Sequence, residues 1–405
     1  PRAAPHSAGI APIATAPAAI SASAAGKSIR FSQWVSIQLH AVASTALESA
    51  DSAITVTGET SILDLGAKQA KLNVTLGNGS MLKNGTLLAD STITFEDTYI
   101  GTIENIKSSA NLNIGSAPGW VGVTAKGDNS FGAVDIGSGS ALYVVGTLIR
   151  AGDSPVWQTT RVSSLTVHAN GSLYLGSGTS VGMVGSTSVN TVLDIKNAGS
   201  VFVNAPVDVD DSGYRITDLS SSEKGSFTKQ GAGIFSVQNE HTYTGTTTIS
   251  GGTVLLKADN RFAQTSQVLL LSGSFDLGGK TQRSALVEIK GALATLKNGT
   301  FIGSISSITG GTITDLSAAD SGLTLTAGVN NTARVTQLTG TNSFKSITSN
   351  NLTTLRITGQ TTVTDDFTLV QGATMELGTA TTNAATLTVD YLDITTQPSN
   401  ATVPL

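Results

Sequence analysis

The chain has 405 residues, of which 44 are glycine and none is cysteine, with 39% hydrophobic, 5% aromatic and 13% charged residues. This composition is unusual for a compact α/β enzyme, and the regularly spaced apolar residues argue against disorder. A net charge of −5 gives no support for binding to nucleic acid. The lack of cysteine excludes disulfides and thiolate metal sites. The sequence has no run of 18 apolar residues, so no membrane-spanning helix is predicted.

Residues 1–30 are predicted to form an extended N-terminal arm rich in alanine and proline. Pro12 and Pro17 interrupt the apolar stretch 10–25, and the sequence does not start with methionine. Proline breaks a helix, so we interpret this stretch as an arm of a mature protein, with a remnant targeting sequence as the alternative. Residues 30–47 are the predicted cap of the domain that follows.

From about residue 32 onward, apolar residues fall at alternate positions, which places them on one face of a β-strand. The clearest unit has two apolar residues two apart, a short turn, and a second such pair eight positions after the first. Three copies carry this unit, and Leu112, Ile114 and Trp120 indicate an earlier one. The copies are Val134 and Ile136 with Leu142 and Val144, Leu165 and Val167 with Leu173 and Leu175, and Leu193 and Ile195 with Val201 and Val203.

Short strands joined by corners that contain Gly, Asn and Ser recur about every 20 to 30 residues, which predicts successive turns of a β-helix. The fold class we expect is all-β, a right-handed parallel β-helix (β-solenoid) that forms an elongated rod. A β-sandwich is the alternative, although an aromatic-rich core between two sheets is missing. We expect the β-helix and its cap to occupy residues 31–225.

Two distant segments of the sequence are copies of each other. Leu63-Asp64-Leu65-Gly66 is followed by Leu82-Lys83-Asn84-Gly85-Thr86-Leu87, and the same order returns in Phe275-Asp276-Leu277-Gly278 and Leu296-Lys297-Asn298-Gly299-Thr300-Phe301. The two spacers differ by two residues. Such a self-match indicates a repeated supersecondary unit.

Residues 227–256 read FTKQGAGIFSVQNEHTYTGTTTISGGTVLL. This segment closely resembles the autotransporter-associated β-strand repeat, also called the passenger-associated transport repeat, of bacterial autotransporter passengers. His241 stands where that family favours Asn, and Thr246 where it favours a second Gly. The positions that match are Lys229, Gly231, Gly233, Tyr243, Thr244, Gly245, Ile249, Gly251, Gly252 and Thr253.

The resemblance predicts repeat turns over residues 226–303, followed by further β-helix turns over 304–405. In this last part Leu355, Ile357, Val363, Phe367, Leu369, Met375 and Leu377 share odd parity and are expected to face inward. An autotransporter passenger is normally followed by a membrane barrel, and no barrel pattern is found in this sequence. The export route is therefore open.

Two short motifs that resemble nucleophile segments are interpreted as polar turns. Gly152-Asp153-Ser154-Pro155 lacks the residue that serine proteases and esterases place after the serine, and Gly178-Thr179-Ser180 has no accompanying His or Asp block. A nucleophilic serine requires a base and an orienting acid. Since none of the four histidines lies in a protease-like motif, we expect no catalytic residues.

Clustered carboxylates occur at Asp208, Asp210 and Asp211, and at Asp365 and Asp366. In β-helical pectin-degrading enzymes such clusters act in catalysis or bind calcium. Here Val207 and Val209 are expected to face inward, which leaves Asp208 and Asp210 outward. Asp366 is also predicted outward and Asp365 near a corner, and we expect no metal and no cofactor.

Tyr243 is expected to be a packing residue with a hydrogen-bonded hydroxyl, and His241 lies at a turn of the repeat. The resemblance implies a non-enzymatic β-helix, extracellular or on the outer cell surface of a bacterium, with an adhesive or structural role. Its expected partner is a ligand on a host or neighbouring cell, or a second copy of the chain. The alternative is a self-assembling filament or sheath subunit joined through its N-terminal arm and open β-helix ends.

Overall fold

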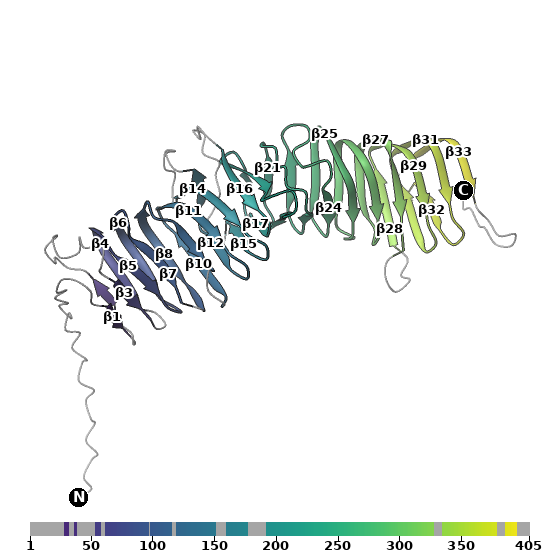
Figure 1. The fold of residues 1–405 in the computed structure, drawn as a ribbon. Coiled ribbons are helices and arrows are strands. Elements are labelled where there is room, and N and C mark those ends of the chain that lie inside the picture. The colour runs from purple at the N-terminus through teal and green to yellow at the C-terminus, as the bar shows by residue number, and fades with distance from the viewer. Residues whose placement is uncertain are drawn as a thin grey trace, which may run out of the picture.

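The computed structural model of the protein is a coil of β-strands stacked into a long rod (Figure 1). It describes residues 28–31, 36–38, 53–57, 61–96, 98–115, 119–150, 159–176, 192–327, 334–378 and 385–394. In this part all the strands belong to one continuous ladder with parallel pairing, and no helix is present. The prediction of an all-β parallel solenoid is confirmed.

The strands are short in the first two thirds of the rod and longer toward its C-terminal end. The first eleven are β1 (Ser28–Phe31), β2 (Ser36–Gln38), β3 (Ala53–Val56), β4 (Ile62–Ala70), β5 (Asn73–Leu76), β6 (Met81–Leu87), β7 (Thr92–Phe95), β8 (Tyr99–Ser108), β9 (Leu112–Ile114), β10 (Val121–Lys126) and β11 (Asn129–Ile136). The next eleven are β12 (Ala141–Val144), β13 (Thr147–Arg150), β14 (Thr159–Val167), β15 (Ser172–Leu175), β16 (Leu193–Asn197), β17 (Ser200–Asn204), β18 (Val209–Asp210), β19 (Tyr214–Asp218), β20 (Ser226–Gln230), β21 (Ile234–Val237) and β22 (Thr247–Ile249). The last eleven are β23 (Thr253–Leu256), β24 (Gln267–Leu270), β25 (Ser274–Ile289), β26 (Thr295–Ser307), β27 (Gly311–Leu325), β28 (Arg334–Thr339), β29 (Thr341–Ser349), β30 (Thr353–Ile357), β31 (Gln360–Leu369), β32 (Thr374–Leu377) and β33 (Thr386–Ile394).

Each turn of the coil passes over three faces. The first face carries the ladder β3, β5, β7, β9, β11, β14, β16 and β19, and the second carries β4, β6, β8, β10, β12, β15, β17, β20, β22 and β24. The third face carries the C-terminal parts of β4, β6 and β8 and, farther along, β18, β21 and β23. Long strands such as β25 bend around two corners and contribute to all three faces.

The core of the rod is formed by alternate side chains that point inward and stack from turn to turn. All twelve residues of the three predicted units are buried. Leu142, Leu173 and Val201 form one column on the second face, whereas on the first face Leu165 stacks on Ile195 and not on Leu193, the equivalent residue of the next unit. Spacing on one face therefore does not fix the register on the next.

Three inward predictions were wrong, at Trp120, Leu377 and Val207. Trp120 is 42% exposed, because the inward positions of β10 are Val121, Val123 and Ala125, and its ring covers Gly122 on the outside. Leu377 is 52% exposed, since β32 pairs in the described part with β30 alone and no second turn covers it. Leu355, Ile357, Val363 and Phe367 are buried as predicted, and Leu369 and Met375 are partly buried against the core.

Residues 1–27, and much of the predicted cap over 30–47, lie outside the described residues. Within the cap, β1 pairs with β3 and β2 pairs with β4, both in parallel. The boundaries at residues 30, 225 and 303 between the predicted segments stay predictions.

The internal copies found in the sequence belong to two larger blocks of four turns, which we call the N-block (residues 62–131) and the C-block (274–344). In both, the Asp of the first turn accepts a hydrogen bond from the Gly two residues later, 2.9 Å at Asp64 and 2.8 Å at Asp276. In both, the Asn of the second turn donates its amide to that Asp, at 3.3 Å from Asn84 and 3.1 Å from Asn298.

The third and fourth turns of the blocks also correspond. Asn105 and Asp315 have φ values of 54° and 52°, and each accepts the backbone N–H that follows a glycine of the next turn, at Asp128 and Thr341. The buried Asn129 and Asn342 then accept the N–H groups of Ile106 and Leu316, at 3.0 and 3.1 Å. This match extends to Phe131 and Phe344, so the two blocks correspond over four turns.

Candidate functional site

The segment that resembles the transport repeat forms one turn of the solenoid and the start of the next. It contains β20 and β21, a coil over 238–246 that follows the first face, and then β22 and β23 on the second and third faces. Phe227 of the segment pairs with Val201 of the preceding turn, and Thr253 of the segment pairs with Ser274 of the following turn. The segment is therefore bonded on both sides.

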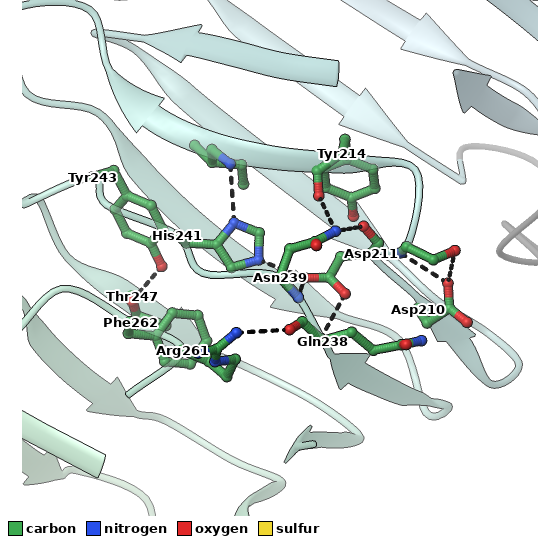
Figure 2. A network of polar contacts seen from close by, with 12 residues as sticks. Asp210, Asp211, Tyr214, Gln238, Asn239, His241, Tyr243, Thr247, Arg261 and Phe262 are labelled. Carbon is green, nitrogen blue, oxygen red and sulfur yellow. Dashed lines mark hydrogen bonds and ion pairs between the residues drawn. The ribbon is translucent and has the colours of Figure 1, made fainter. Parts of the chain in front are cut away.

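A buried Asp211–His241 pair ties this turn to the preceding one (Figure 2). The Asp211 carboxylate accepts the N–H groups of Gln238 at 2.7 Å and Asn239 at 3.0 Å, and it lies 2.9 Å from Nε2 of His241. Nδ1 of His241 accepts the N–H of Ile216 at 3.0 Å, which places the imidazole proton on Nε2. Both ring nitrogens therefore form hydrogen bonds to the preceding turn, at a place where the coil over 238–246 forms no β-strand.

Lys229 lies inside the solenoid, stacked between Val203 and Ile249 in a column of apolar side chains. Its ammonium group turns to the corner and donates to the carbonyl oxygens of Gln230 at 2.6 Å, Gly231 at 2.9 Å and Gly251 at 3.3 Å. Burial lowers the pKa of Lys229 to about 8, against a smaller opposing effect of Asp208. The lysine of the motif is a corner clasp between two turns.

Tyr243 is fully buried, and its hydroxyl lies 2.5 Å from Oγ1 of Thr247, as expected for a packing residue. Burial raises its pKa well above the usual range of a tyrosine. Around it, Phe227, His241 and Phe262 have ring centroids 6.0 to 6.4 Å apart. This aromatic core is a local exception in a chain with few aromatic residues.

The glycines of the motif allow neighbouring turns to approach closely at one corner. A Cβ at Gly233 would lie 2.1 Å from the carbonyl oxygen of Val207, and one at Gly252 would lie 2.3 Å from that of Gly233. Thr244 is held differently, because its N–H and hydroxyl both donate to Asp218, the latter at 2.6 Å. The remaining motif positions serve the same stacking: Gly231, Gly245 and Gly251 lie over backbone of the preceding turn, Ile249 is buried, and Thr253 pairs with Ile234.

The acidic cluster before this segment differs in part from its prediction. Asp208 is exposed and accepts the N–H of Ile234, while Asp210 is half-buried and accepts from Ser212. Val207 was predicted inward and is 36% exposed, because the chain turns a corner before β18. Asp211 was not predicted to be buried, although its parity with Val209 is a signal for it.

No arrangement for catalysis is found in the described part of the chain. The motifs at 152–155 and 178–180 lie outside the described residues, and the Asp211–His241 pair contacts no nucleophilic side chain. Among the described residues, no group of three His, Asp or Glu side chains could hold a metal ion. Asp365 and Asp366 are both exposed, beside a register shift between Val363 and Asp366.

The described residues also hold no helix with the length and apolarity needed to cross a membrane. Comparison with known proteins identifies one family: residues 227–256 match the model of the passenger-associated-transport-repeat. No curated protein and no solved structure shows a significant match to the chain. The turn that the buried Asp–His pair, the corner lysine and the stacked glycines build is thus a passenger-associated transport repeat, of the family found in autotransporter passengers.

Proposed function

We propose that this chain is a passenger, secreted or displayed on the outer surface of a bacterial cell, which acts without catalysis as an adhesive or structural rod. The observation that carries the proposal is the transport repeat at 227–256, built into a continuous parallel solenoid. Such a rod presents long faces to a ligand on a host or neighbouring cell. Both ring nitrogens of His241, in the buried Asp211–His241 pair, form hydrogen bonds within the fold.

The repeat itself is proposed to template the stacking of turns during export. Its residues His241 and Thr244 form hydrogen bonds with Asp211 and Asp218 of the preceding turn. Within the repeat, Lys229 donates to the carbonyl oxygens of Gly231 and Gly251 and so links the same corner of two successive turns. In a solenoid each turn is stabilised by its neighbours, so a turn with extra fixed contacts favours growth of the ladder from that point. Amide hydrogen exchange on the intact chain tests this, since residues 227–256 should exchange more slowly than flanking turns; equal or faster exchange contradicts the role.

The location and the adhesive role have separate tests. Protease treatment of intact bacteria that produce the protein should remove it, and binding of the purified chain to cultured cells should saturate. A protein that resists protease until the cells are broken contradicts surface display. If the chain is displayed but binds no cell or surface, the adhesive role is contradicted and only the structural role remains.

A self-assembling filament subunit is the second candidate. In the described part β33 pairs with β31 alone, and Tyr391, Leu392 and Ile394 are 61%, 49% and 37% exposed. An exposed strand edge with apolar side chains favours pairing with another chain, although Asp390 and Asp393 oppose it. Negative-stain microscopy should show filaments that disappear when residues 1–30 are deleted; unchanged filaments would contradict exchange of the arm.

A further inference from the structure

A groove of about 620 Å³ runs along one corner of the N-block, between its second and third faces. Its lining includes the small residues Gly66, Ala67 and Gly85 and comes from four successive turns. Turns in a parallel ladder are about 4.8 Å apart, comparable with the length of one sugar residue in an extended chain. The groove is thus a polar track that follows the axis of the rod.

The polar side chains of this track are fixed by one another. Asn84 donates to Asp64, Asn105 donates to Oδ1 of Asn84 at 3.1 Å, and the N–H of Asp128 donates to Asn105. Oδ1 of Asp128 accepts a further backbone N–H, that of Thr159. Amide and carboxylate groups in fixed register present donors and acceptors without an ordering cost on binding.

Comparison with the C-block separates the architectural residues from the others. Asp64, Asn84 and Asn129 recur as Asp276, Asn298 and Asn342. Three exposed polar residues of the groove do not recur: Asn105 corresponds to Asp315, and the charged residues Lys107 and Asp128 correspond to Ser317 and Thr341. The same corner folds without these charges, so the corner itself does not require Lys107 or the carboxylate of Asp128.

We propose that this groove binds a neutral oligosaccharide, with Lys107, Asp128, Asn105 and Thr86 as its hydrogen-bonding residues. The carboxylates of Asp64 and Asp128 offset the charges of Lys83 and Lys107, which disfavours an anionic ligand. A peptide strand would need unpaired backbone, and here the backbone belongs to the ladder. Hydroxyl groups both donate and accept, as a mixed wall of ammonium, carboxylate and amide requires.

This inference deepens the proposed adhesive function by naming a ligand class. The test is an array of neutral and acidic saccharides probed with the intact chain, followed by calorimetry with the neutral saccharide that binds best. The decisive variant is Lys107→Ser with Asp128→Asn, since asparagine retains the oxygen for the Thr159 N–H. The matched control is Ser317→Ala with Thr341→Ala in the C-block. Loss of the ammonium donor of Lys107 and of the charged acceptor of Asp128 should weaken binding by at least about tenfold, with no change in the control.

Three outcomes overturn the inference: no neutral saccharide binds, only acidic ones bind, or the Lys107–Asp128 variant binds as well as the original chain. Unfolding in urea and hydrogen exchange over the N-block verify that the variant is folded. Cell binding separates the two proposals. A variant that loses saccharide binding but still adheres to cells leaves adhesion intact and removes the groove from it, whereas an original chain that binds saccharide but no cell refutes the adhesive role alone.

Discussion

The N-block and the C-block use the same corner in different places. In the N-block the Asp–Asn corner joins the second face to the third, as β4 passes from Asp64 to Lys68. In the C-block it joins the third face to the first, as β25 passes from Asp276 to Lys280. The corner of the C-block is thus displaced by one face around the axis of the rod relative to the corner of the N-block. The corner is defined by contacts between successive turns and not by its position on the coil.

The blocks differ in what fills the core behind that corner. Leu63 and Leu87 of the N-block correspond to Phe275 and Phe301 of the C-block, and all four side chains are buried. Phe275 contacts Phe262 with ring centroids 6.0 Å apart, which continues the aromatic core of the transport repeat. The C-block therefore stacks directly on the repeat, while the corner of the N-block is filled by leucines and lies several turns away.

The largest effect should come from the transport repeat, because its buried Asp211–His241 pair has no counterpart in the described residues of either block. Asp211→Leu leaves the N–H groups of Gln238 and Asn239 and the Nε2–H of His241 without an acceptor. We expect a loss of about 4 kcal/mol in the free energy of unfolding, since each orphaned buried donor costs on the order of 1 to 3 kcal/mol. Urea unfolding measures it. A loss below that of the block variants described next would show that the repeat is not held more firmly than they are.

The equivalence of the blocks is tested by Asn129→Leu and Asn342→Leu. Each substitution removes the acceptor of one buried N–H, at Ile106 or Leu316, and an amide donor to backbone carbonyls. Asn129 donates to Lys126 and, at a longer 3.3 Å, to Gly127, and Asn342 donates to Thr339. We expect about 3 kcal/mol from each, with faster hydrogen exchange confined to the altered block. Clearly unequal losses would mean that the cores, and not the corners, decide the stability of the blocks.

The sequence predicts the coil because its signal is local. Alternating residues such as Val134 and Ile136 determine which side chains face inward, and Asn84 and Asn298 mark the corners. It does not predict the four-turn length of the blocks, since Asp315 stands at the position of Asn105 and Ser317 at that of Lys107. Nor does it predict the Asp211–His241 pair, whose members are 30 residues apart and meet only through the stacking of turns.

The clasp at Lys229 predicts how stability changes with pH. The pKa of Lys229 falls from 10.5 in the unfolded chain to about 8 in the folded one. Between these values the unfolded state binds more protons, so stability rises with pH; below pH 8 the cost of the buried charge is constant and full. From pH 8 to 9.5 the gain should be about 1 to 2 kcal/mol.

Lys229→Met should remove this slope, and urea midpoints at pH 7, 8, 9 and 9.5 measure it. The range stops there because the buried Tyr214 and Tyr243, whose pKa values burial raises, oppose folding at higher pH. Lys83→Met, at a partly exposed ion pair of the N-block, is the control and should keep the slope. If the methionine variant at position 229 still gains stability with pH, another group causes the effect.

The smallest effect separates the two corners themselves. Asp64→Ala and Asp276→Ala each remove an acceptor of a glycine N–H and an ion pair with the lysine of the next turn, at 3.5 Å for Lys83 and 3.4 Å for Lys297. The side chain of Asp64 is 7% exposed and that of Asp276 is 16% exposed. Since water can replace a lost acceptor more easily at an exposed corner, we expect about 1 kcal/mol at Asp64 and less at Asp276. Urea midpoints of the two variants at low and high salt decide the point: a larger loss at Asp276, or a loss that salt abolishes, would mean that charge pairing and not the turn hydrogen bond holds the corner.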